Sequence, residues 1–112
     1  MKIWIFSLVA FFSTATWSQT DDQRFESCRS KLLKANELEV LHAFDWKPPA
    51  PPKVVVGRIF YTIPFDAKEG FAETVNCFLV SGARDKHINF TVRDWQSNKI
   101  IGRYFNGKFT MN

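Results

Sequence analysis

The sequence is poor in the residues that build catalytic and metal sites. Among its 112 residues are 2 cysteines, Cys28 and Cys77, and 2 histidines, His42 and His87. Neither a Cys-x-x-Cys nor a His-x-x-x-His spacing occurs, which argues against a structural zinc site. A cysteine nucleophile would need an activated thiol beside a histidine. We therefore expect no metal, no cofactor and no catalytic residue, and a protein that is not an enzyme.

A long hydrophobic run is also absent. Residues 3–12 are apolar except for Ser7, and they follow the positive charge of Lys2. A helix that crosses a membrane needs about 20 apolar residues, so this run is too short for an anchor. A short apolar run behind a positive charge is typical of a signal peptide.

The polar stretch after this run favours cleavage. Small residues fit a cut after Ser18, with Ala15 as the alternative. We predict a signal peptide over residues 1–18 and a single small domain over residues 19–112. The mature protein is expected to be periplasmic or secreted, without a stable membrane anchor after cleavage.

Export changes the interpretation of the two cysteines. In an oxidising compartment, two cysteines in a small domain favour a disulfide over reactive thiols. Only one pairing is available, Cys28 with Cys77. Closing a loop of about 50 residues would stabilise the fold by on the order of 4 kcal/mol, through the lost entropy of the unfolded chain.

The first part of the predicted domain has the pattern of an amphipathic helix. Apolar residues recur at spacings of three and four: Phe25, Cys28, Leu32 and Ala35. Asp21 and Asp22 are candidate N-caps. Residues 37–46 fit a strand or a further helical turn, and we expect a helical or irregular segment. Residues 47–53 contain four prolines, and we expect a stiff crossover because proline is excluded from helices and central strands.

From this point the pattern changes to strands. Residues 54–63 are rich in β-branched and aromatic side chains, which favours a first strand. Residues 66–70 suggest a single helical turn that leads into a second strand. With residues 81–86 as a loop, the second and third strands would pair Val80 with His87, Leu79 with Ile88, Cys77 with Phe90 and Val75 with Val92.

Turn residues mark the remaining strands. A turn over residues 96–98, with Asn98 in the left-handed conformation, pairs Phe90 with Tyr104, Val92 with Gly102 and Asp94 with Ile100. Asn106-Gly107 is typical of a two-residue hairpin turn. We therefore predict an α+β fold, in which an N-terminal helix packs on a four- to five-stranded antiparallel meander sheet. The disulfide is expected to join this helix to the sheet.

The sheet face away from the helix is the expected binding surface. Solvent-facing sheet surfaces are mostly polar, whereas aromatic and arginine side chains anchor many interfaces. The expected register collects there Thr74, Asn76, Phe78, Thr91, Arg93, Trp95, Lys99, Ile101, Arg103 and Phe105. The predicted binding residues among them are Arg93, Trp95, Lys99, Arg103, Phe105 and Phe78. The alternative is that residues 37–46 or the first strand fold over this face and bury its aromatic rings.

One short segment resembles an inhibitory motif. Lys53-Val54-Val55-Val56-Gly57 is similar to the Gln-x-Val-x-Gly loop of the cystatin family, and Asp94-Trp95 resembles the tryptophan-bearing hairpin of that family. Lysine stands at position 53 in place of glutamine, and prolines precede the motif where a cystatin continues a strand. The resemblance implies inhibition of a cysteine protease.

The charge balance limits the classes of partner that the protein is expected to bind. The formal net charge is +4, and the last third of the chain carries the excess of lysine and arginine. This balance suits another protein with an acidic patch or an anionic envelope component, and the charge is too sparse for nucleic acid. We expect an exported, non-enzymatic binding module such as an inhibitor, an immunity protein or an envelope accessory protein. A small secreted hydrolase or effector is the alternative.

Overall fold

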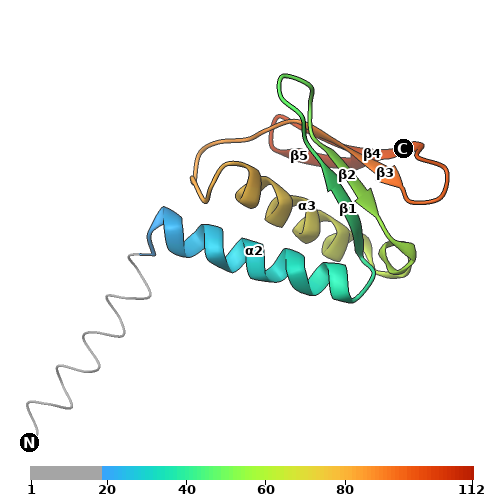
Figure 1. The fold of residues 1–112 in the computed structure, drawn as a ribbon, viewed down its shortest axis with the longest axis horizontal. Helices are drawn as coiled ribbons and strands as arrows, with labels where there is room; N and C mark the ends of the chain where they lie inside the picture. The colour runs from blue at the N-terminus through green and yellow to red at the C-terminus, as the bar shows by residue number, and fades with distance from the viewer. Residues whose placement is uncertain (1–18) are drawn as a thin grey trace, which may run out of the picture.

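The protein has two layers, a five-stranded sheet and two helices that cover one of its faces (Figure 1). The computed structural model describes residues 19–112, so the predicted signal peptide over residues 1–18 lies outside the described residues. In chain order the elements are α2 (Asp21–Glu37), β1 (Leu41–Asp45), β2 (Lys53–Val56), the 3-10 helix η1 (Arg58–Thr62), α3 (Phe65–Leu79), β3 (Phe90–Asp94), β4 (Ile100–Phe105) and β5 (Lys108–Met111). The predicted α+β class is confirmed.

The sheet is mixed and is not a strict meander. Its strand order is β1-β2-β3-β4-β5, and all neighbours are antiparallel except β2 and β3, which run parallel. Parallel neighbours need a crossover connection, and α3 lies in that connection. The prediction of a uniformly antiparallel sheet is therefore wrong at this pairing.

The segment that was expected to supply a strand is the helix α3. Residues 66–70 and 75–80 do not form a turn and a strand, because α3 runs through both up to Leu79. Phe71, Val75 and Leu79 follow one another at spacings of four residues and are buried, which is the pattern of one helix face. The strand pairs predicted for Val75 to Val80 are therefore wrong.

The N-terminal helix is confirmed, but its cap differs from the expected one. Thr20 is the N-cap, in place of Asp21 or Asp22. Thr20 Oγ1 accepts a hydrogen bond from the backbone N–H of Gln23 (3.1 Å), and Gln23 Oε1 accepts one from the backbone N–H of Thr20 (2.9 Å). This is a capping box. The two aspartates lie in the first turn, where negative charge is favourable near the helix N-terminus.

The expectation of a helical or irregular segment over residues 37–46 is wrong. After α2 ends at Glu37, Glu39 adopts a positive φ of 63° and β1 begins at Leu41. Strand β1 then pairs antiparallel with β2. The proline-rich stretch is accordingly the loop of a β1–β2 hairpin and not a crossover, and Lys53 at its end belongs to β2.

The strand predicted over residues 54–63 is shorter than expected. It ends at Val56, and residues 58–62 form η1 instead. The backbone of Glu39 passes close to Gly57, where an added Cβ would lie 2.3 Å from the carbonyl oxygen of Glu39. This close approach leaves room only for glycine at the point where the chain leaves β2.

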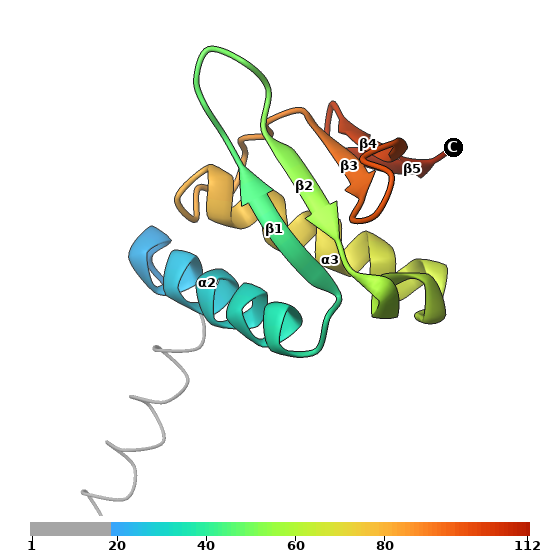
Figure 2. The same ribbon diagram turned by 45° about the vertical axis from the view of Figure 1, so that its right-hand side comes forward.

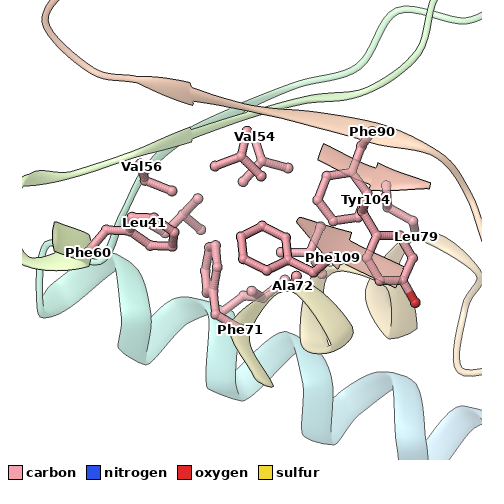
Figure 3. Packing of buried hydrophobic residues seen from close by; sticks show 13 residues of the cluster. Leu41, Val54, Val56, Phe60, Phe71, Ala72, Leu79, Phe90, Tyr104 and Phe109 are labelled. Carbon is pink, nitrogen blue, oxygen red and sulfur yellow. The ribbon is translucent and has the colours of Figure 1, made fainter. Parts of the chain in front are cut away.

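The core fills the space between the sheet and the helices (Figure 3). The sheet contributes Leu41, Val54, Val56, Phe90, Val92, Tyr104 and Phe109, and the helical segments contribute Leu32, Phe60, Phe71, Ala72, Val75 and Leu79. Burying a large apolar side chain stabilises a fold by about 1.5–3 kcal/mol. The predicted disulfide between Cys28 and Cys77 is present, but it joins α2 to α3 and not a helix to the sheet.

The register of the last three strands is largely as predicted. Phe90 lies opposite Tyr104 and Val92 opposite Gly102. Asn98 adopts the left-handed conformation with a φ of 59°, and the hairpin residues Asn106 and Gly107 have φ of 50° and 79°. The predicted pair of Asp94 with Ile100 is wrong, because the register shifts after Val92 and Ile100 lies opposite Arg93.

Candidate functional site

Both helices lie on the same side of the sheet, and no helix of residues 19–112 covers the other side (Figure 2). Residues 41–45 and 53–56 do not fold over that side, since they are strands of the sheet itself. The side chains that alternate with buried residues there form a surface that we call the outer face. It consists of Asp45, Lys53, Val55, Thr91, Arg93, Arg103, Phe105, Lys108 and Thr110.

Three of the predicted binding residues lie on the outer face: Arg93, Arg103 and Phe105. Phe105 is 60% exposed, the largest exposed fraction among the large hydrophobic residues of the described part of the chain. Lys99 is exposed in the turn before β4. Ile101, at the register shift, packs against the core instead of lying on this face.

Sequence analysis missed two cations of the outer face, Lys53 and Lys108. Both are exposed strand residues directly beside a buried one, Val54 and Phe109 respectively. The alternation of exposed and buried positions is the pattern that could have found them.

In the described part of the chain no cation of the outer face forms an ion pair, although Asp45 lies directly opposite Lys53. The ion pairs in the described part of the chain join Arg29 with Glu26, Lys34 with Glu37, and Arg58 with Glu39. None of them involves a residue of the outer face. The outer face therefore presents positive charge that is available to a negatively charged partner.

A shallow hollow opens on the outer face beside Phe105. It has a volume of about 270 Å³, and its lining includes Pro51, Asn89, Thr91 and Arg103. The side-chain oxygen of Asn89 accepts a hydrogen bond from the backbone N–H of Asn106 at 3.0 Å, which fixes the orientation of the amide. The surface of the hollow is mainly apolar, and one cation and two neutral polar side chains, Asn89 and Thr91, are among the residues that line it.

Trp95 lies apart from this hollow. It follows the last residue of β3, its ring is 39% exposed, and its centroid is 6.0 Å from that of His42 on β1. The two rings border a separate hollow of about 190 Å³. That hollow also contains the ion pair between Glu39 and Arg58, whose atoms are 2.6 Å apart.

Phe78 is not part of the outer face, so its predicted position on the sheet face away from the helix is wrong. It belongs to α3, where its ring stacks on Phe25 of α2 at a centroid distance of 5.2 Å. Together with Leu33 and Phe44 it lines an apolar hollow of about 310 Å³ between α2 and β1. Thr74 also lies on α3, on the helical side of the protein.

Asn76, which was expected on the outer face, is buried within a polar network. Its amide donates to the carbonyl oxygen of Lys86 at 3.0 Å and accepts from the backbone N–H of Ile88 at 2.9 Å. The hydroxyl of Tyr104 lies 3.2 Å from His87 Nδ1 and donates to Glu73 at 3.0 Å. Burial, followed by the hydrogen bond to the Glu73 carboxylate, raises the pKa of Tyr104. The phenol therefore stays protonated near neutral pH.

Asp94 fixes the turn between β3 and β4 beside the outer face. One carboxylate oxygen accepts a hydrogen bond from the Tyr61 hydroxyl, and the other accepts from Gln96 N (3.0 Å), Ser97 N (2.8 Å) and Ser97 Oγ (3.0 Å). The hydrogen bond from Tyr61, followed by those from Ser97, lowers the pKa of Asp94 to about 2. Partial burial, followed by the hydrogen bond to Asp94, raises the pKa of Tyr61 to about 12.

These two pKa values predict opposite limits of pH stability. Asp94 is more acidic in the folded state, so its contribution is complete above about pH 4 and is lost as the pH falls toward 2. Tyr61 is less acidic in the folded state, so its contribution is complete below about pH 10 and is lost as the pH rises toward 12. NMR titration of the Asp94 carboxyl should show its pKa rising in Tyr61→Phe. An unchanged Asp94 pKa in that variant would contradict the assigned cause.

Comparisons with protein-family models, curated proteins and solved structures find no match to this chain. No helix in residues 19–112 is long and apolar enough to cross a membrane. Within the same residues, no cluster of three or more histidine, cysteine, aspartate or glutamate side chains could hold a metal ion. Both cysteines are in the disulfide, so neither is a free thiol.

Proposed function

We propose that this protein is an exported, non-enzymatic binding module that uses the outer face of its sheet. The observation that carries this proposal is the outer face itself, where Lys53, Arg93, Arg103 and Lys108 share one surface with the exposed ring of Phe105 and form no ion pair. Aromatic and arginine side chains are the types that anchor interfaces. The disulfide supports export, since such bonds persist in oxidising compartments.

The partner is proposed to be negatively charged, either an acidic protein or an anionic envelope component. Concentrated positive charge on a flat sheet face steers such partners toward it. An inhibitor, an immunity protein or an envelope accessory protein would each use a surface of this kind. We assign the polar network around Tyr104 a structural role, because the Tyr104 hydroxyl donates to Glu73 and the Asn76 amide is hydrogen-bonded to the backbone.

Charge reversal tests this proposal. The exported wild-type protein and Arg103→Glu would each be immobilised and exposed to the same envelope extract. Reversal places a negative charge at the centre of the outer face, so the partner retained by the wild type should bind at least about tenfold more weakly. Surface plasmon resonance with the recovered partner measures the loss.

Lys31→Glu provides the matched control. Lys31 is exposed on α2, so this variant makes the same charge change on the helical layer. It should retain the partner as the wild type does. Equal losses in both variants would indicate a general effect of net charge, and undiminished binding by Arg103→Glu would refute a role for the outer face.

A further inference from the structure

Thr91 lies at the centre of three cations on the outer face. Lys53 is its neighbour on β2 and Arg103 is its neighbour on β4, while Arg93 follows two residues later on β3. Neighbouring strands are about 4.8 Å apart, and successive side chains on one face are about 7 Å apart. The three side chains therefore leave the same face of the sheet within about 7 Å of Thr91. Asp45 on β1 lies directly opposite Lys53, on the side of Lys53 away from Thr91.

Arg93 is already held in place at this point. Its Nε lies 3.4 Å from Thr91 Oγ1, and its Nη1 donates to the carbonyl oxygen of Asn98 at 3.3 Å. Three neighbouring cations repel one another, and Thr91 rather than a carboxylate stands between them. An oxyanion above Thr91 would replace this repulsion with charge-assisted hydrogen bonds, which are the stronger class in proteins.

The hollow beside Phe105 sets a second requirement for the chemistry of the ligand. Thr91 and Arg103 belong both to the cation cluster and to the hollow beside Phe105. A group that fills the hollow would lie against the exposed ring of Phe105 and within reach of the amide of Asn89. An aromatic ring beside neutral polar groups suits a moiety with one apolar face and several hydroxyls.

We propose that this part of the outer face binds an anionic glycan, a chain of sugar rings that carry carboxylate or phosphate groups. The oxyanion is held above Thr91 by Lys53, Arg93 and Arg103, and the sugar ring that carries it stacks on Phe105. This inference rests on the proposed function, because it names the chemistry of the partner for the same face. It favours the anionic envelope component over the acidic protein.

The choice of a glycan over an acidic protein rests on the hollow. An acidic loop would satisfy the three cations through side-chain carboxylates, but it would need a second residue, aromatic or proline, to place a ring in the space of about 270 Å³ beside Phe105. The outer face is also the side of the sheet and not its edge, so a peptide could not extend the strand hydrogen bonding there. A sugar ring with an attached oxyanion fills both parts of the site.

Calorimetric titration of the exported protein tests the inference with four probes. These are oligogalacturonate, glucose 1-phosphate, a neutral galactan oligosaccharide of matched length, and polyglutamate. We expect binding of oligogalacturonate or glucose 1-phosphate, which distinguishes carboxylate from phosphate. Binding should weaken as salt rises, and it should be at least about tenfold tighter than that of the neutral oligosaccharide and polyglutamate.

Three variants assign this binding to the site. Arg103→Gln should weaken it about tenfold by removing a charged donor, and Phe105→Ala should weaken it by a similar factor while leaving its salt dependence unchanged. Lys31→Gln on α2 should have no effect. Retention of the disulfide and of the wild-type circular dichroism spectrum excludes unfolding as the cause of a loss.

Two outcomes would overturn the inference. The first is that polyglutamate binds as tightly as the sugar anions and that Phe105→Ala leaves binding unchanged. This outcome would indicate an acidic protein partner. The second is no binding of either sugar anion. In both cases the proposed function still stands if Arg103→Glu loses its envelope partner. The experiments therefore distinguish a wrong ligand class from a wrong binding surface.

Discussion

Replacing Cys28 and Cys77 together by serine is expected to lower the free energy of unfolding by about 4 kcal/mol. The two cysteines are 49 residues apart in the sequence, and a cross-link across a loop of this length strongly restricts the unfolded chain. The total stability of a small domain is only about 5–15 kcal/mol, so this loss is a large share of it. Urea unfolding of the variant and the wild type under the same conditions measures the difference.

The loss should be concentrated in α2. Leu32 is the buried residue of this helix, whereas Leu33 and Leu38 are 52% and 53% exposed. Apart from the disulfide, α2 is held by modest contacts such as the stack of Phe25 on Phe78. Hydrogen exchange should therefore quicken first in α2 and last in the sheet. An unchanged unfolding midpoint, or exchange that quickens equally in α2 and β3, would contradict this role.

The β3–β4–β5 unit could be predicted because local sequence determines it. Asn98 tolerates the left-handed conformation that the turn between β3 and β4 requires, and Asn106-Gly107 favours the tight hairpin after β4. Once these turns are placed, alternation of apolar residues sets the register. The prediction failed at the register shift after Val92. No local sequence pattern indicates the extra residue that produces this shift.

Helix α3 could not be distinguished from a strand by the same reasoning. Val75, Cys77 and Leu79 alternate as they would in a strand, yet Val75 and Leu79 also fit one face of a helix. Gly70 suggested a helix stop but lies within α3. The disulfide did not discriminate between the two readings, because two cysteines allow the same pairing in either fold.

The outer face was predicted where it depends on strand alternation and mispredicted where it does not. Arg93, Arg103 and Phe105 follow the alternation of β3 and β4 and were placed correctly. Trp95 follows the end of β3, where the chain has left the pleated sheet. The predicted position of Phe78 assumed a strand over residues that form the helix α3, so that position is wrong.

Two glycine substitutions near the helices are expected to have opposite effects on stability. Gly82→Ala should lower the free energy of unfolding by about 3 kcal/mol, because alanine is strained in the left-handed conformation and the site has no room for a methyl group. Gly82 has a φ of 83°, and an added Cβ would lie 2.0 Å from the carbonyl oxygen of Asp21 and 2.9 Å from the backbone nitrogen of Phe25. Both atoms belong to the backbone of α2, so the clash cannot be relieved by rotation of a side chain.

Gly70→Ala is the matched control, because it makes the same chemical change inside α3. An added Cβ at Gly70 meets no atom within 4 Å, and alanine is favoured over glycine in a helix interior by about 1 kcal/mol. This variant should therefore unfold at a higher urea concentration than the wild type, and Gly82→Ala at a lower one. If Gly82→Ala were as stable as the wild type, the close packing of the residues after α3 against the first turn of α2 would be wrong. If Gly70→Ala were destabilised instead, position 70 would not lie on an open face of α3.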